Sequence, residues 1–114
     1  MESLDRFTRS QGIEHIDFLH VDTEGHDLEV LRGADRLLGS GGVDLIEVEA
    51  GMNPQNGTHV PIELLKRHLE ERDYSLFALY EQVREVYERK PHLRRVNAVF
   101  VSAQVIAAQE GIGV

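Results

Sequence analysis

The stretch that decides the fold runs from residue 16 to residue 38 and reads IDFLHVDTEGHDLEVLRGADRLL. Its first six residues are mostly apolar with β-branched members, which predicts a strand buried between helix layers. The apolar residues after position 27 recur at mostly helical spacing, which predicts one continuous helix to residue 38. Thr23 stands where the N-cap of that helix belongs, and the glycines at 39, 41 and 42 end it.

Shorter patterns predict further helices and strands before residue 16 and after residue 38. Residues 4–12 are predicted to form a helix, and Pro61 suits the first turn of another helix that runs to about Arg72. Further apolar runs predict three more strands, near residues 43–49, 74–80 and 96–102.

Two segments carry weaker signals. The polar segment 82–95 is predicted to be partly helical, and the tail 103–114 is predicted to fray.

Strands that alternate with helices predict an α/β fold, a mostly parallel sheet of about four strands with flanking helices. The first three strands are expected to be parallel and linked by right-handed crossovers. Because no clear crossover helix precedes the last strand, we expect it to be an antiparallel strand at the edge.

Length and composition limit the kind of protein this chain can form. Its 114 residues suffice for one domain, and 41% hydrophobic and 28% charged residues are ordinary for a soluble protein. The net charge of -8 and the lack of a basic stripe argue against nucleic-acid binding. The absence of cysteine excludes disulfides and thiolate metal sites, and no apolar stretch approaches the ~20 residues that span a membrane. We expect a cytoplasmic protein with neither a nucleic-acid nor a membrane partner.

Carboxylates follow the predicted strands at one rim of the sheet. Ligands of an open α/β sheet bind beyond the carboxyl ends of its strands, and Asp22, Glu24, Glu49 and Glu81 occupy such positions. An acid there can act as a general base or accept hydrogen bonds from hydroxyl or ammonium groups. Asp22 and Glu24 have an alternative role as caps of the next helix, whose N-terminus stabilises acids without any catalytic need.

Two acids share one face of the second predicted strand, because Glu47 and Glu49 are two residues apart. We assign Glu49, nearer the rim, to function, and Glu47 to structural pairing with a cation such as Arg32 or Arg94. His59, in the loop after this strand, is a candidate acid, base or substrate contact. A solvated loop histidine is the alternative.

A metal site is a less favoured interpretation of the same region. His20, Asp22, Glu24 and His26 are residue types that hold divalent metals. The helix expected from about residue 24 breaks the alternation that would bring them together, so no metal ligand is assigned. The sequence also contains no glycine-rich phosphate loop and no G-x-S-x-G elbow.

Several blocks of the chain resemble FkbM-type methyltransferases. The most specific is residues 16–34, an apolar strand, an Asp-x-Glu-Gly turn and a helix that ends in Leu-x-Gly-Ala. Three shorter blocks support it, namely Val48-Glu49-Ala50-Gly51 with Asn53-Pro54, Leu79-Tyr80-Glu81-Gln82, and residues 94–100. Together the similar blocks extend from about Leu4 to Ser102.

The resemblance implies a Rossmann-like fold that uses S-adenosylmethionine to methylate a hydroxyl of a sugar or other secondary metabolite. In that fold the chain looks like the last four strands, so residues 1–114 form a single partial domain. By the resemblance, Asp22, Glu24 and Glu49 are catalytic, and Asp22 and Thr23 lie against the cofactor. Asn53 and His59 lie where the substrate would bind.

The family's first half, with its glycine-rich loop and ribose-binding acid, has no counterpart in this sequence. We therefore expect a fragment, a truncated reading frame or a non-catalytic remnant, with weak or absent cofactor binding by the chain alone. The strand near 16–21 would then be an open edge, which favours a homo-oligomer or pairing with the missing N-terminal half. An interaction domain derived from the fold and a divalent-metal module are the alternatives.

Overall fold

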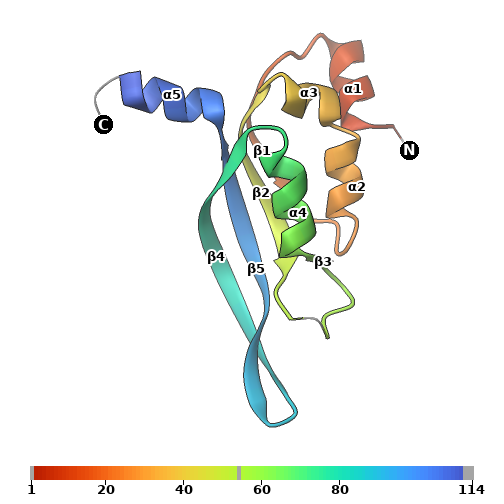
Figure 1. The fold of residues 1–114 in the computed structure, drawn as a ribbon. Helices are drawn as coiled ribbons and strands as arrows, with labels where there is room; N and C mark the ends of the chain where they lie inside the picture. The colour runs from red at the N-terminus through yellow and green to blue at the C-terminus, as the bar shows by residue number, and fades with distance from the viewer. Residues whose placement is uncertain (1, 54, 112–114) are drawn as a thin grey trace.

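The computed structural model describes residues 2–53 and 55–111, and within them five strands form one mixed sheet (Figure 1). The strands are β1 (Ile16–Val21), β2 (Val43–Gly51), β3 (Val60–Pro61), β4 (Tyr74–Tyr87) and β5 (Lys90–Ser102). The helices are α1 (Leu4–Gln11), α2 (Asp27–Arg32), α3 (Asp35–Gly39), α4 (Ile62–Glu70) and α5 (Ala103–Gly111). The α/β class and the four main strand positions agree with the sequence analysis.

The order of the main strands across the sheet is β1-β2-β5-β4, and the short β3 lies beside the end of β2. β1 and β3 each pair with β2 in parallel, whereas β5 is antiparallel to both β2 and β4. The predicted mostly parallel sheet is wrong, because the sheet is mixed: β1, β2 and β4 share one direction, but β4 pairs only with the antiparallel β5. The prediction of an antiparallel last strand is confirmed, but its predicted edge position is wrong, because β5 lies between β2 and β4.

The segment 82–95, predicted to be partly helical, is instead the outer part of the long β4–β5 hairpin, which reaches beyond the helices (Figure 1). Glu88 and Arg89 form its turn, and both have positive φ, 51° and 65°. Two such residues between paired strands are typical of the primed turn that matches strand twist. The sequence did not predict this turn, because Glu88 and Arg89 occupy positions where glycine or asparagine is usual.

The helix expected to continue to residue 38 is two helices, α2 and α3, separated at Gly33 and Ala34. Asp5 of α1 causes the break, because its carboxylate accepts the backbone N–H groups of Arg36 and Leu37 at 2.8 and 3.1 Å. These N–H groups therefore have a partner outside their own helix, which starts a new helix N-terminus.

The hydrophobic core lies on one face of the sheet, beneath helices α1 to α4 (Figure 1). Leu31, Leu38, Leu65 and Leu69 from the helices pack against Ile46, Val48, Ala98 and Phe100 from the sheet, all of them fully buried. The opposite face leaves Phe18 49% and Tyr80 50% exposed. The prediction that the first strand is buried between helix layers is therefore wrong, and β1 is a half-exposed edge strand.

The tail predicted to fray forms helix α5, which projects from the end of β5 (Figure 1). Ser102 starts the helix, because its hydroxyl accepts the backbone N–H of Val105 at 3.2 Å. Residues 112–114 of the predicted tail lie outside the described residues. In the part of the chain that is described, no helix has the length and apolar character needed to cross a membrane.

Candidate functional site

The acids expected at a shared rim do meet there. β1 and β2 are parallel and in register, with Val21 opposite Val48, so both strands end on the same side of the sheet. The carboxyl group of Asp22, the residue after β1, lies close enough to that of Glu49 in β2 to raise the pKa of Glu49. The arrangement predicted from strand ends is therefore present for this pair.

Glu49 is the best enclosed acid of the rim, with a side chain 12% exposed. His59 contacts its Oε1 atom through Nε2, and the His59 side chain is 6% exposed. Arg95 of β5 approaches the same oxygen, with Nε 3.4 Å away. Strands β2 and β5 and the loop before β3 thus converge on one carboxylate.

The pKa of Glu49 is raised above its ordinary value. Burial is the largest cause, because it disfavours the charged carboxylate, and the hydrogen bond and negative charge of Asp22 act in the same direction. Arg95, and His59 when its ring is protonated, oppose the shift without cancelling it. A carboxyl group with a raised pKa is suited to exchanging a proton near neutral pH.

The loop that carries His59 is held by two asparagines. Asn56 is buried, and its amide nitrogen donates to the backbone oxygen of Arg94 at 2.9 Å. Asn53, also buried, donates to Glu85 of β4 at 3.2 Å and accepts the N–H of Gln55. Asn53 therefore has protein partners on both ends of its amide, and Pro54 beside it lies outside the described residues.

Asp27, which the sequence analysis treated only as an acid near a helix start, is fully buried at the centre of this region. Its Oδ1 atom accepts the N–H of Thr23 at 3.1 Å and also contacts the Thr23 hydroxyl. Its Oδ2 atom accepts the N–H of Glu49 at 2.9 Å. Several acids follow β1 in the sequence, which indicated that one of them could bind nearby backbone N–H groups. The sequence could not tell that the buried one is Asp27 and that Glu24 is exposed.

Thr23 has a local partner besides Asp27, because its hydroxyl also accepts the N–H of His26 at 3.1 Å. Glu24 is exposed and has a positive φ of 52°, in the turn between β1 and α2. The next residue, Gly25, has φ of 112°, and a Cβ there would lie 2.4 Å from the backbone oxygen of Thr58. The turn therefore packs directly against the loop of His59.

A hollow of about 480 Å³ opens outside this contact. It is lined by the turn after β1, one side of α2 and the 57–61 segment, and includes Glu24, Arg32 and His59. Its volume lies within the range of small-molecule sites, ~300–1,000 Å³. The rim thus combines an enclosed acid with an adjacent open space.

Residues 1–81 match the methyltransferase FkbM domain. The chain belongs to the FkbM methyltransferase domain family. No curated protein and no solved structure matches it. The matched segment contains both paired acids, Asp22 just after β1 and Glu49 near the end of β2.

Two other acids that the sequence analysis singled out in this FkbM domain, Glu47 and Glu81, have structural partners. Glu47 contacts Nε2 of His20 at 3.3 Å and accepts a hydrogen bond from Asn97 at 3.5 Å. The predicted structural pairing of Glu47 is present, but the predicted arginine partners are wrong. Glu81 lies inside β4 rather than at a strand end, and it accepts a hydrogen bond from Asn97 at 3.0 Å.

The residues weighed as metal ligands do not gather. His20 pairs with Glu47, and His26 lies 3.5 Å from Glu29 on the surface of α2. In the described residues, the histidine and acids close enough to share an ion are His15, Asp17 and Asp44, at the other end of β1 and β2.

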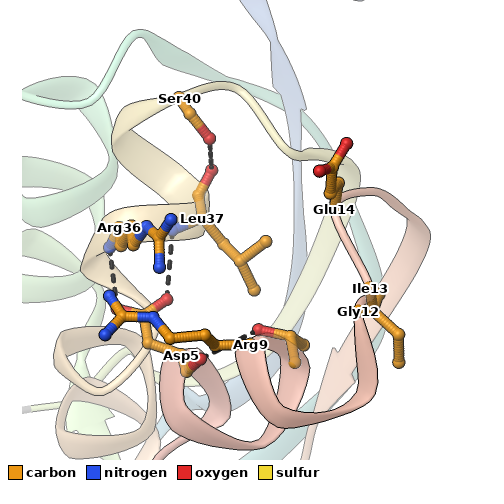
Figure 2. Close-up of a pocket in the computed structure, with 9 residues that line it drawn as sticks. Asp5, Arg9, Gly12, Ile13, Glu14, Arg36, Leu37 and Ser40 are labelled. Atoms are coloured by element: carbon orange, nitrogen blue, oxygen red, sulfur yellow. Dashed lines mark hydrogen bonds between the residues drawn. The ribbon is translucent and has the colours of Figure 1, made fainter.

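A second hollow, of about 320 Å³, lies at that other end, between α1, α3 and the start of β1 (Figure 2). Figure 2 shows Asp5 directed at the backbone of Arg36 and Leu37, and Ser40 donating to the Leu37 carbonyl. Asp5 and Ser40 thus complete helix ends. This hollow lies before the start of β1, whereas Asp22 follows the end of that strand.

Proposed function

We propose that this chain supplies the catalytic rim of an S-adenosylmethionine-dependent O-methyltransferase whose acceptor is a hydroxyl of a sugar or another secondary metabolite. The observation that carries the proposal is the approach of Asp22, just after β1, to Glu49, near the end of β2, within the segment that matches the family. The order β1-β2-β5-β4, with one antiparallel strand inside, supports its assignment to the second half of a larger Rossmann-like sheet.

The fit of S-adenosylmethionine to these residues is partial. The exposed Glu24 borders the hollow outside β1, and Asp22, also exposed, lies two residues before it. Both carboxylates suit the sulfonium and ammonium charges of the cofactor. Thr23 is committed to Asp27 and His26, which makes its backbone rather than its hydroxyl the better contact. The described residues include no glycine-rich turn after a strand to hold the nucleoside, so we expect weak binding by this chain alone.

Glu49 is the residue that we assign to the acceptor's proton. The cofactor, when bound, supplies an electrophilic methyl group. As the acceptor oxygen gains its bond to carbon, its O–H bond breaks and the proton passes to the Glu49 carboxylate. A raised pKa makes Glu49 a stronger base than an ordinary glutamate, and the positive charge of Arg95 favours its ionised form. Asp22 and Glu24 accept hydrogen bonds from neighbouring hydroxyls.

The proposal is tested by titrating S-adenosylmethionine into the ¹⁵N-labelled chain and following backbone amide shifts. We expect shifts at residues 22–26 and 49–53, with roughly millimolar affinity, and weaker shifts with neutral S-adenosylhomocysteine. Mixing the chain with a polypeptide that carries the glycine-rich strand, loop and helix of an FkbM methyltransferase should then give methyl transfer, which Glu49→Gln reduces about 100-fold. Equal shifts with both ligands, or shifts only near the Figure 2 hollow, would contradict it.

A non-catalytic interaction domain gives a different result in the same experiments. It would bind neither ligand and would show no methyl transfer after mixing. The acids of the rim would then serve only the fold, and Glu49→Gln would alter stability alone.

A further inference from the structure

The hydrogen bonds around Asn56 fix which nitrogen of His59 carries a proton. The Asn56 Oδ1 atom accepts two backbone N–H groups, from Thr58 at 2.9 Å and from His59 at 3.2 Å. An oxygen is required on that side of the amide, because an NH₂ group there would face two donors. The amide nitrogen must therefore point the other way.

On that other side the amide nitrogen has two neighbours. It donates to the Arg94 carbonyl at 2.9 Å and lies 3.0 Å from Nδ1 of His59. Oδ1 is 3.4 Å from the same Nδ1, but it is already occupied by two shorter bonds. With an N–H donor facing it, Nδ1 must be the unprotonated acceptor of the imidazole ring.

The ring proton is then left on Nε2, which faces Oε1 of Glu49. His59 consequently donates to the carboxylate and is not available as a proton acceptor for a substrate. Arg95 approaches the same Oε1, so both protein donors hold one oxygen of Glu49. Neither of these donors holds the second oxygen, Oε2, which leaves it as the oxygen available to Asp22 and the rim.

We propose that Asn56 and His59 form a positioning pair, in which Asn56 sets the Nε2–H tautomer of His59 and His59 holds Glu49 by Oε1 so that Oε2 is presented at the rim. This assigns a role to Asn56, which lies seven residues from Glu49 in the sequence. It also changes the role of His59, which acts on the substrate through Glu49 instead of contacting it directly. Because the pair acts on Glu49, the importance of the pair for catalysis rests on the proposed function. The tautomer of His59 does not depend on that function.

The tautomer is measured by long-range ¹H–¹⁵N correlation of the histidine rings in the full chain at pH 7.5. His59→Gln identifies the His59 signals by their loss, and exposed His15 and His26 serve as references in the same spectrum. We expect Nε2–H with a bare Nδ1 for His59. A proton on Nδ1, in either the other tautomer or the imidazolium, would overturn the inference.

The decisive variant is Asn56→Asp, which keeps an oxygen for the Thr58 and His59 N–H groups but cannot donate to Nδ1. It should move a proton onto Nδ1 while the circular dichroism spectrum stays that of the parent. If the variant is unfolded, Asn56→Ala, which removes the donor together with the oxygen, replaces it. An unchanged Nε2–H pattern in the folded variant would overturn the role of Asn56.

The effect of the pair on catalysis is measured in the methyl-transfer assay described above, in which the chain is mixed with the glycine-rich polypeptide. Misplacing Glu49 should lower kcat by up to about 100-fold in Asn56→Asp with little change in KM, since the substrate is not contacted. His59→Gln retains an N–H near the Nε2 position and should recover part of this loss. If the parent itself transfers no methyl group, the proposed function fails while the spectroscopic result for the pair stands. A raised KM with unchanged kcat would overturn the positioning role.

Discussion

The carboxylate of Asp27 at the start of α2 accepts the backbone N–H of Glu49 in β2, at 2.9 Å. The same carboxylate accepts the N–H of Thr23, which follows β1. One buried acid thus joins the segments that carry Asp22 and Glu49, and it sets the separation of the two rim carboxylates.

Replacing Asp27 by Asn tests this link. The amide keeps one accepting oxygen but turns an NH₂ group toward either Glu49 N–H or Thr23, which leaves buried donors facing each other. Hydrogen bonds to charged groups contribute about 1.5–3 kcal/mol, and we expect Asp27→Asn to lower the free energy of unfolding by about that amount in urea titrations. Asp17→Asn, at a side chain 93% exposed, is the control and should change stability by less than about 0.5 kcal/mol. Equal stability of both variants would show that Asp27 is not the link.

The raised pKa of Glu49 predicts a pH-dependent effect of Glu49→Gln. The folded state favours the protonated carboxyl, so its contribution to stability is fully present below the ordinary value of 4.5 and is lost as pH rises through the folded value. Glutamine does not titrate. The stability of Glu49→Gln relative to the parent should therefore increase with pH above about 4.5, by about 1.4 kcal/mol for each unit of elevation. Chemical unfolding at a series of pH values measures this difference, and a difference that falls with pH would contradict the assigned direction.

The lowered pKa of His68 in α4 predicts that this residue makes the fold less stable in acid. Burial, followed by the positive charge of Arg72, lowers its pKa below the ordinary 6.5, although Asp35 at 3.0 Å opposes the shift. Its neutral form is favoured in the fold, so its contribution is present above pH 6.5 and is lost as pH falls through the folded value. His68→Gln should therefore lose less stability than the parent on acidification below pH 6.5. His26→Gln, at an exposed side chain, should follow the parent curve.

The sequence predicted the α/β class, the four main strands and the meeting of Asp22 with Glu49, because apolar runs and strand ends are local signals. It did not predict the position of β5, the break between α2 and α3, or the central place of Asp27. Each of these depends on partners distant in the sequence. Asp5 creates the helix start at α3 from 31 residues away, and Asp27 reaches Glu49 across 22 residues. Local spacing carries no information about such bonds.

Tyr74 offers a test of how β2 is attached to the hairpin. Its hydroxyl donates to the Val43 carbonyl at 2.7 Å and accepts the Val43 N–H at 3.3 Å, in the buried core. Burial raises the pKa of Tyr74, which keeps the hydroxyl protonated. Tyr74→Phe leaves both Val43 groups without that partner and should lower the free energy of unfolding by about 1–3 kcal/mol. Tyr80→Phe, at a side chain 50% exposed, is the matched control and should have little effect. If the two variants lose the same free energy of unfolding, the Tyr74 hydroxyl does not hold β2 to the hairpin.

The free side of β1 predicts self-association of the chain. Ile16 donates its N–H to Gly42 at 2.7 Å, toward β2, so the alternate residues Asp17, Leu19 and Val21 turn their backbone groups outward. Two copies related by a two-fold axis can pair these groups, with Leu19 opposite Leu19 and Asp17 opposite Val21. An edge strand with unpaired groups favours such pairing.

Analytical ultracentrifugation over a range of concentrations should therefore show a species of twice the 12.9 kDa chain mass. Asp17→Pro removes an outward N–H without breaking the ladder to β2, and it should shift the equilibrium to the monomer while the thermal unfolding of the monomer stays similar. Asp17→Ala keeps that N–H and should associate like the parent. If the parent sediments as a single chain at every concentration, the edge of β1 does not pair with a second copy.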